Sequence, residues 1–115
     1  MKEFLLLFWN TSGDGQYQVS PEEMKAQMES WQSWIGNIAM TGNLISTKPI
    51  QFEGTCIGNN GVKNHPAIFE KNMVTGYLLC KAKDKEEVSN WAATCPILKS
   101  PEGFTEIREI SPFEI

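Results

Sequence analysis

The sequence predicts an α+β protein with a single domain over residues 1–115. Three observations predict this class: a continuous apolar run near the start, two segments with helix-start signals and an apolar stripe, and strand-like segments before, between and after them. A chain of this length buries roughly two thirds of the surface that its unfolded form exposes. We therefore expect one hydrophobic core.

The first two elements have the clearest signals. Residues 3–9 are expected to form a strand, because the run from Phe4 to Trp9 is continuously apolar, which is typical of a strand buried on both faces. A polar loop over 10–19 follows, and Ser20, a proline and Glu23 then combine an N-cap with a capping box. The helix that begins there ends before Gly42 and carries an apolar stripe at spacings of three and four: Met24, Met28, Trp31, Ile35 and Ile38.

Two further strands are expected in the middle of the chain, over residues 44–52 and 73–82. Pro49 cannot donate to a strand ladder, so the first of them is expected at a sheet edge or at a bulge. Gly58 to Gly61 predicts a turn, and residues 62–72 are expected to be irregular.

The last part of the chain predicts a second helix and a final strand. Asp84 is the expected N-cap, Glu87 completes a capping box, and Pro96 ends the helix, whose apolar face is Val88, Trp91, Ala92 and Cys95. Residues 104–110 are rich in Phe, Thr and Ile and form the last strand.

The order strand, helix, strand, strand, helix, strand is the βαββαβ pattern of a ferredoxin-like fold, an antiparallel sheet with both helices on one face. Two helices cannot cover both faces of the sheet, yet the first strand is apolar on both sides. A monomer would therefore expose a large apolar patch, which soluble proteins rarely do. We expect a homodimer that buries this face.

Charge and composition exclude several classes of partner. The formal net charge of −4 leaves no basic surface for nucleic acid, and no apolar stretch approaches the ~20 residues of a membrane-spanning helix. We expect a cytoplasmic protein whose Cys56, Cys80 and Cys95 are reduced thiols. One histidine excludes a multi-histidine metal site, and the glycine-containing loop at 12–15 matches no nucleotide-binding consensus, so neither metal nor cofactor is expected.

Four strings along the chain resemble the YCII-related family, particularly its DGPF-containing branch: KEFLLLF, SPEEMKAQMESWQSWIGNIAMTGNLIS, NHPAIFEKNMVTGYLL and KAKDKEEVSNWAATCPIL. The resemblance implies a ferredoxin-like protomer that dimerises into an α+β barrel with a cleft beside the first helix. It also implies a link to small, often aromatic, molecules, on which a few members of the family look like enzymes.

The sequence departs from the family pattern where chemistry is expected. Where related chains place an aspartate and a histidine as a suspected acid/base pair, this chain has Asn10 and Gln27, and neither amide shuttles protons near neutral pH. Where the DGPF branch has its motif, this chain reads Asn64-His65-Pro66-Ala67 and keeps only the proline. With Trp34 offering its ring N–H, these amides predict a pocket that binds an uncharged, flat molecule without acid/base catalysis.

Two alternatives remain open. The first is a small-molecule enzyme of lyase or isomerase type that uses the loop residues Asp14, His65 or Glu70, of which Asp14 and His65 are also candidate ligand contacts. The second is a structural or partner-binding module, which no motif in the sequence indicates.

Overall fold

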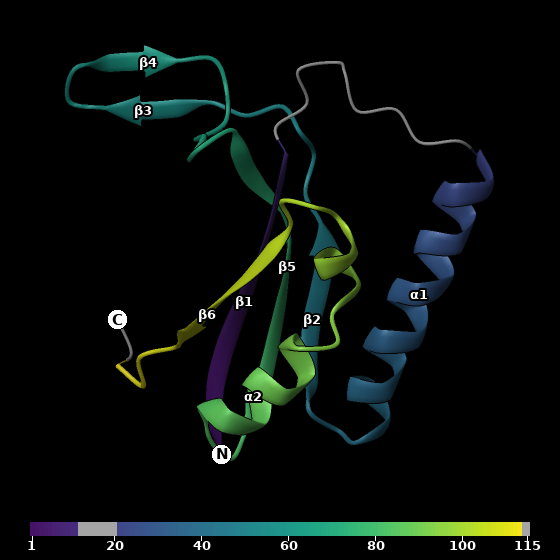
Figure 1. Cartoon of the computed structure of the whole chain (residues 1–115). Coiled ribbons are helices and arrows are strands. Elements are labelled where there is room, and N and C mark those ends of the chain that lie inside the picture. The colour runs from purple at the N-terminus through teal and green to yellow at the C-terminus, as the bar shows by residue number, and fades with distance from the viewer. Residues whose placement is uncertain (12–20, 114–115) are drawn as a thin grey trace.

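A computed structural model describes residues 1–11 and 21–113 and contains a four-stranded antiparallel sheet in the order β2-β5-β1-β6 (Figure 1). This confirms the predicted α+β class and ferredoxin-like order of elements. The main elements are β1 (Lys2–Thr11), α1 (Pro21–Met40), β2 (Leu44–Pro49), β5 (Asn72–Ala82), α2 (Lys85–Ala92) and β6 (Phe104–Glu109).

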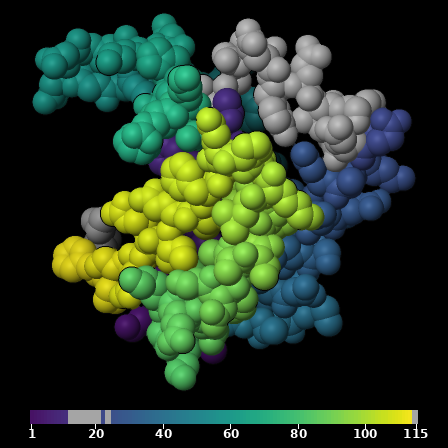
Figure 2. Space-filling model, in the orientation of Figure 1, coloured from purple at the N-terminus to yellow at the C-terminus, as the bar shows by residue number. Residues whose placement is uncertain are grey.

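The prediction missed a small hairpin between β2 and β5. Strands β3 (Cys56–Gly58) and β4 (Gly61–Lys63) pair with each other in a separate sheet, around the turn that the sequence predicts. Figures 1 and 2 show this hairpin projecting from the body of the molecule. Each strand has three residues, too few for an alternating pattern to be recognised. The sequence therefore predicts only the turn, with residues 62–72 irregular.

The edge strand β2 is shorter than predicted and ends at Pro49 instead of residue 52. It lies at the edge of the sheet, as its proline requires, and its pairing with β5 shifts register between Leu44 and Ser46. Of the two alternatives expected from Pro49, the edge position is therefore confirmed, because the register shift lies away from the proline.

The core lies between the sheet and the two helices. Alternate residues of β1 point into it, and Phe4 and Leu6 are completely buried. They pack with β5, α1, α2 and the segment after α2, in a cluster that contains Phe8, Trp34, Ile38, Leu78, Cys80, Ala82, Val88, Cys95 and Ile97. Both helices therefore cover the same face of the sheet.

The buried stripe of α1 differs from the predicted one. Trp34 and Ile38 are its most buried residues, Trp31 and Ile35 are partly buried, and Met28 is 57% exposed. The described part of Met24 does not include its side chain, and the predicted cap at Ser20 lies outside the described residues. The helix is thus rotated toward Trp34 relative to the expected stripe.

The second helix begins as predicted and ends earlier than predicted. The Asp84 side chain accepts a hydrogen bond from the Glu87 N–H at 3.0 Å, which is the expected N-cap. The Glu87 side chain instead accepts from Asn43 Nδ2 at 3.4 Å. Cys95 lies beyond the helix, at the cap of a short 3₁₀ helix, η1 (Pro96–Lys99).

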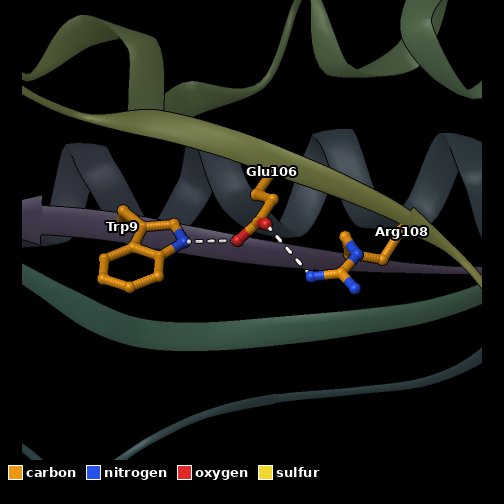
Figure 3. A network of polar contacts seen from close by, with 3 residues as sticks. All are labelled: Trp9, Glu106 and Arg108. Atoms are coloured by element: carbon orange, nitrogen blue, oxygen red, sulfur yellow. Dashed lines mark hydrogen bonds and ion pairs between the residues drawn. The ribbon is translucent and has the colours of Figure 1, made fainter. Parts of the chain in front are cut away.

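The face of the sheet opposite the helices, called the open face below, carries an apolar strip that is only partly buried. The strip consists of Leu5, Leu7, Trp9, Tyr77, Leu79 and Phe104, which pair across neighbouring strands, and Lys48, Glu106 and Arg108 pair with its members on the same face. The indole of Trp9 stacks on Phe104 and donates to Glu106 at 3.1 Å, and Arg108 lies 3.5 Å from the same carboxylate (Figure 3). Among the described helices, none is long and apolar enough to cross a membrane.

Candidate ligand cleft

A cleft of about 230 Å³ lies between the first helix and the segment that follows the second. In Figure 2 the green-to-yellow surface that contains this segment meets the blue surface of α1. The cleft is lined by Asn10 from β1, by four residues of α1, Ala26, Gln27, Ser30 and Trp31, and by Pro96, Ile97, Lys99, Ser100 and Pro101. Asn10 and Gln27, which the sequence singles out together, thus line the same cleft.

The wall formed by residues 96–101 is shaped by a proline and a glycine. Pro96 is the first residue of η1, a position whose N–H has no partner within the helix, so proline loses no hydrogen bond there. The chain then turns back, with the Ser100 N–H donating to Ile97 at 3.2 Å and the Gly103 N–H donating to Ser100 at 3.1 Å. A Cβ at Gly103 would overlap the carbonyl oxygen of Ile97, so only glycine fits this close approach.

Asn10 reaches the cleft because it continues the helix side of β1. Phe8 lies two residues earlier on that side and is buried, so alternation directs Asn10 toward the helices as well. The carbonyl of its side chain accepts the Thr11 N–H at 2.8 Å, which directs its NH₂ group to the Ser100 hydroxyl at 3.3 Å. The amide is therefore held in one orientation at the end of the strand.

Lys99 brings a charge to the cleft that the sequence reasoning missed. Its ammonium donates to the Ser30 hydroxyl at 3.3 Å, which links η1 to α1 across the cleft. It is the one ionisable side chain among the described residues that line the cleft. No local pattern marks Lys99, because its position depends on how the segment after Pro96 packs on a helix about seventy residues earlier.

The two tryptophans of α1 exchange the roles expected of them. Trp34 is 7% exposed and its ring N–H donates to the Trp91 carbonyl at 3.0 Å, so the expectation of an available N–H at a pocket is not met. Trp31 lines the cleft instead. It makes edge-to-face contacts with Phe8 and Trp34, at ring separations of 4.9 and 5.7 Å, which hold its ring in place.

His65 lies elsewhere, in the segment after the β3–β4 hairpin. It is exposed and lines a second, wide-open hollow with Phe52, Glu53, Gly54, Thr55, Asn64 and Pro66. Its Nδ1 lies 2.9 Å from the Pro66 carbonyl, which requires a proton on Nδ1. The Cys56 thiol donates to the backbone carbonyl of His65 at 3.4 Å and thus contacts the main chain of this residue.

The two remaining candidates do not join the described cleft. Glu70 and Lys71 occupy the two-residue turn between Phe69 and Asn72, with positive φ angles of 50° and 71°. Neither Glu70 nor His65 is a lining residue of the cleft, and Asp14 lies outside the described residues. The described part of the chain contains no group of three or more His, Cys, Asp or Glu side chains arranged to hold a metal ion.

Two of the three thiols are buried and inert. Burial raises the pKa of the Cys80 thiol to about 11, and the nearby charge of Glu87 adds to the effect. Burial also raises the pKa of Cys95 to about 11. Because the thiolate is the reactive form, neither is suited to nucleophilic chemistry near neutral pH.

Comparison with known proteins places the chain in a family. One solved structure with a similar course is 5-chloro-2-hydroxyhydroquinone dehydrochlorinase from Burkholderia phenoliruptrix AC1100 in complex with 2,5-dihydroxybenzoquinone. It is 13% identical, with 93% of each chain covered and a TM-score of 0.45. No curated protein matches the sequence. The family model of the YCII-related domain matches residues 6–114, and the chain therefore belongs to the YCII-related family.

Proposed function

We propose that this protein acts in the cytoplasm as a homodimer that binds a small, flat molecule in the cleft beside α1, without a proton-transferring dyad of its own. The observation that carries the proposal is the meeting of Asn10, Gln27 and Trp31 around one cleft. Two amides and an indole supply polar anchors and an aromatic wall, the usual lining of a small-ligand pocket.

The absence of a catalytic dyad is argued from the residues that line this cleft. The described lining contains neither a carboxylate nor an imidazole, and the side-chain amides of Asn10 and Gln27 do not act as general acids or bases near neutral pH. The polar groups of the cleft are thus suited to holding and orienting a ligand.

Native mass spectrometry of the purified protein tests the binding role. We expect a co-purifying molecule of low mass on the wild type that is lost from the Asn10→Ala, Gln27→Ala double variant. Gln32→Ala with Asn37→Ala is the matched control, because these amides lie on the exposed surface of the same helix outside the cleft. Equal retention by the double variant and the control would contradict the proposal.

The open face supports the dimeric state. Leu5, Leu7 and Leu79 form an apolar strip there that the described helices leave uncovered, and stable proteins rarely leave such strips in water. A second copy that packs its own open face against this one buries both strips at once, as a two-fold symmetric interface requires.

Sedimentation equilibrium tests the dimer. We expect twice the mass of the 13.0 kDa chain for the wild type and the mass of one chain for Leu7→Glu, which places a charge in the middle of the open face. Asn90→Glu adds the same charge on the exposed side of α2 and is expected to remain dimeric. A wild type that is monomeric at micromolar concentration would refute the interface.

A catalytic role for the second hollow is the alternative. Its support is that His65 and Glu53, two titratable side chains, line the same depression. A turnover assay on any ligand that co-purifies distinguishes the two roles: a pH–rate profile lost in His65→Gln favours catalysis there, and unchanged turnover in that variant excludes it.

A further inference from the structure

The hydrogen bonds inside the cleft leave a donor on three of its polar side chains, those of Asn10, Ser30 and Ser100. The carbonyl oxygen of Asn10 accepts the Thr11 N–H at 2.8 Å, and its NH₂ group is directed to Ser100 of the cleft wall. One hydrogen of this NH₂ goes to Ser100 at 3.3 Å and the other remains. Asn10 therefore offers a donor.

The hydroxyls of Ser30 and Ser100 can also donate to a ligand. Ser100 accepts from Asn10, and Ser30 accepts from the ammonium of Lys99 at 3.3 Å. A hydroxyl that accepts through its oxygen keeps its own hydrogen for another partner. Ser30 and Ser100 thus both keep a hydrogen to donate.

Charge adds to this arrangement. Lys99 supplies a positive charge, and the described lining has no negative charge to neutralise it. The carboxylate of Glu102 lies close by, but it accepts from the Thr11 hydroxyl at 3.5 Å and is not part of the lining. A ligand oxygen that is both an acceptor and an anion matches these donors best.

The size of the cleft limits the rest of the ligand. Its volume of about 230 Å³ lies below the roughly 300–1,000 Å³ of pockets for drug-sized molecules. We therefore expect a small ligand, with one aromatic ring beside Trp31.

We propose that the ligand is a one-ring aromatic carboxylate, with its anionic oxygens on Lys99, Ser30 and Ser100 and its ring against Trp31. This inference rests on the proposed binding function and gives the class of ligand. It replaces the uncharged molecule that the two amides suggest by themselves, because Lys99 and the orientation of the Asn10 amide emerge only from the fold.

Isothermal titration calorimetry with benzoate and benzamide tests the proposal, since the two probes have the same shape and differ in charge. We expect benzoate to bind at least about fivefold more tightly than benzamide at low salt, a modest ratio because Lys99 is exposed. Lys99→Gln is expected to abolish this preference, because it removes the positive charge and so weakens benzoate binding more than benzamide binding. Lys99→Arg keeps the charge and the preference.

The control variant is Lys63→Gln, which removes the same charge from the exposed hairpin outside the cleft and is expected to keep the preference. Benzamide binding as tightly as benzoate, or an unchanged preference in Lys99→Gln, would overturn the anionic class while leaving a binding cleft. No heat from either probe at millimolar concentration would overturn the aromatic carboxylate class, whereas the binding role of the cleft is decided separately by the co-purification experiment.

Discussion

The layer between the sheet and the helices is tightly packed at one end and hollow at the other, although one strand runs through both. At the packed end, Phe4 and Leu6 of β1 are fully buried against both helices. At the cleft end, the same side of β1 carries Asn10, and α1 faces the segment after Pro96 across a cavity. On this side of β1, Phe8 is the last core residue, and Asn10, two residues further on, lines the candidate cleft.

This difference indicates that stability and the proposed binding depend on separate parts of β1. The packed end contains apolar groups whose burial stabilises the fold, and the cleft end contains amides and hydroxyls that bond to each other or to a ligand. Substitutions at the packed end should therefore mainly lower the free energy of unfolding, and substitutions at the cleft end should mainly lower ligand affinity.

The largest expected effect is at the packed end. Leu6→Ala removes a completely buried side chain and should lower the free energy of unfolding by about 2–5 kcal/mol. Urea unfolding followed by tryptophan fluorescence measures this loss. Asn10→Ala, the control at the cleft end, should lower the free energy of unfolding by less than about 1 kcal/mol. Equal losses at the two positions would contradict the difference between the two ends.

The wall of the cleft is expected to be sensitive at Gly103. Gly103→Ala introduces a Cβ that overlaps the Ile97 carbonyl, so the segment must shift, at a cost of about 1–3 kcal/mol. Unlike Leu6→Ala, it should also weaken ligand binding, because Ile97 lines the cleft. Gly36→Ala is the control, since a Cβ there meets no atom within 4 Å. Equal stability of the two glycine variants would refute the close approach.

High pH should destabilise the packed end. Cys80 and Cys95 have folded-state pKa values of about 11, above the ordinary value of 9.0, so the folded protein keeps protons that the unfolded chain releases. Stability is then full below pH 9 and falls as the pH rises toward 11, by about 1 kcal/mol for each thiol at pH 10. Urea melts from pH 8 to 10.5 measure the slope. The Cys80→Ala and Cys95→Ala variants should each flatten it, and an unchanged slope in both would contradict the assignment.

The smallest expected effect separates the two tryptophans between the ends. Trp34→Phe leaves the Trp91 carbonyl without its indole donor and should cost about 1 kcal/mol of stability with little change in ligand affinity. Trp31→Phe shortens the wall of the cleft and should lower affinity more than stability. Thermal unfolding measures the stability of both variants, and titration with benzoate measures their affinity. A larger loss of affinity in Trp34→Phe than in Trp31→Phe would show that the two roles are assigned wrongly.

The packed end could be predicted from the sequence more fully than the cleft end. Periodicity and capping signals lie within a few residues of each other, so the run near the start and the cap at Asp84 predict a strand and a helix that the structure contains, although this helix ends at Ala92, before Pro96. The β3–β4 hairpin was missed because three-residue strands have no readable period.

The cleft depends on contacts between distant residues, which no local pattern reveals. Asn10 and Gln27 emerged only through the family resemblance, and Lys99 did not emerge at all, because its link to Ser30 joins elements far apart in the chain. The choice between Trp31 and Trp34 depended on the rotation of α1 about its axis, which a stripe of mixed residues leaves loosely defined.

The most direct test of the binding cleft is a ¹⁵N-detected NMR titration of the wild-type protein with benzoate. The account predicts shifts at the Trp31 indole and at the backbone amides of Ser30, Lys99 and Ser100, with the amides of Leu6 and Leu78 unchanged. Shifts that gather at Gly54, Asn64 and His65, or none along the cleft at saturating benzoate, would contradict it.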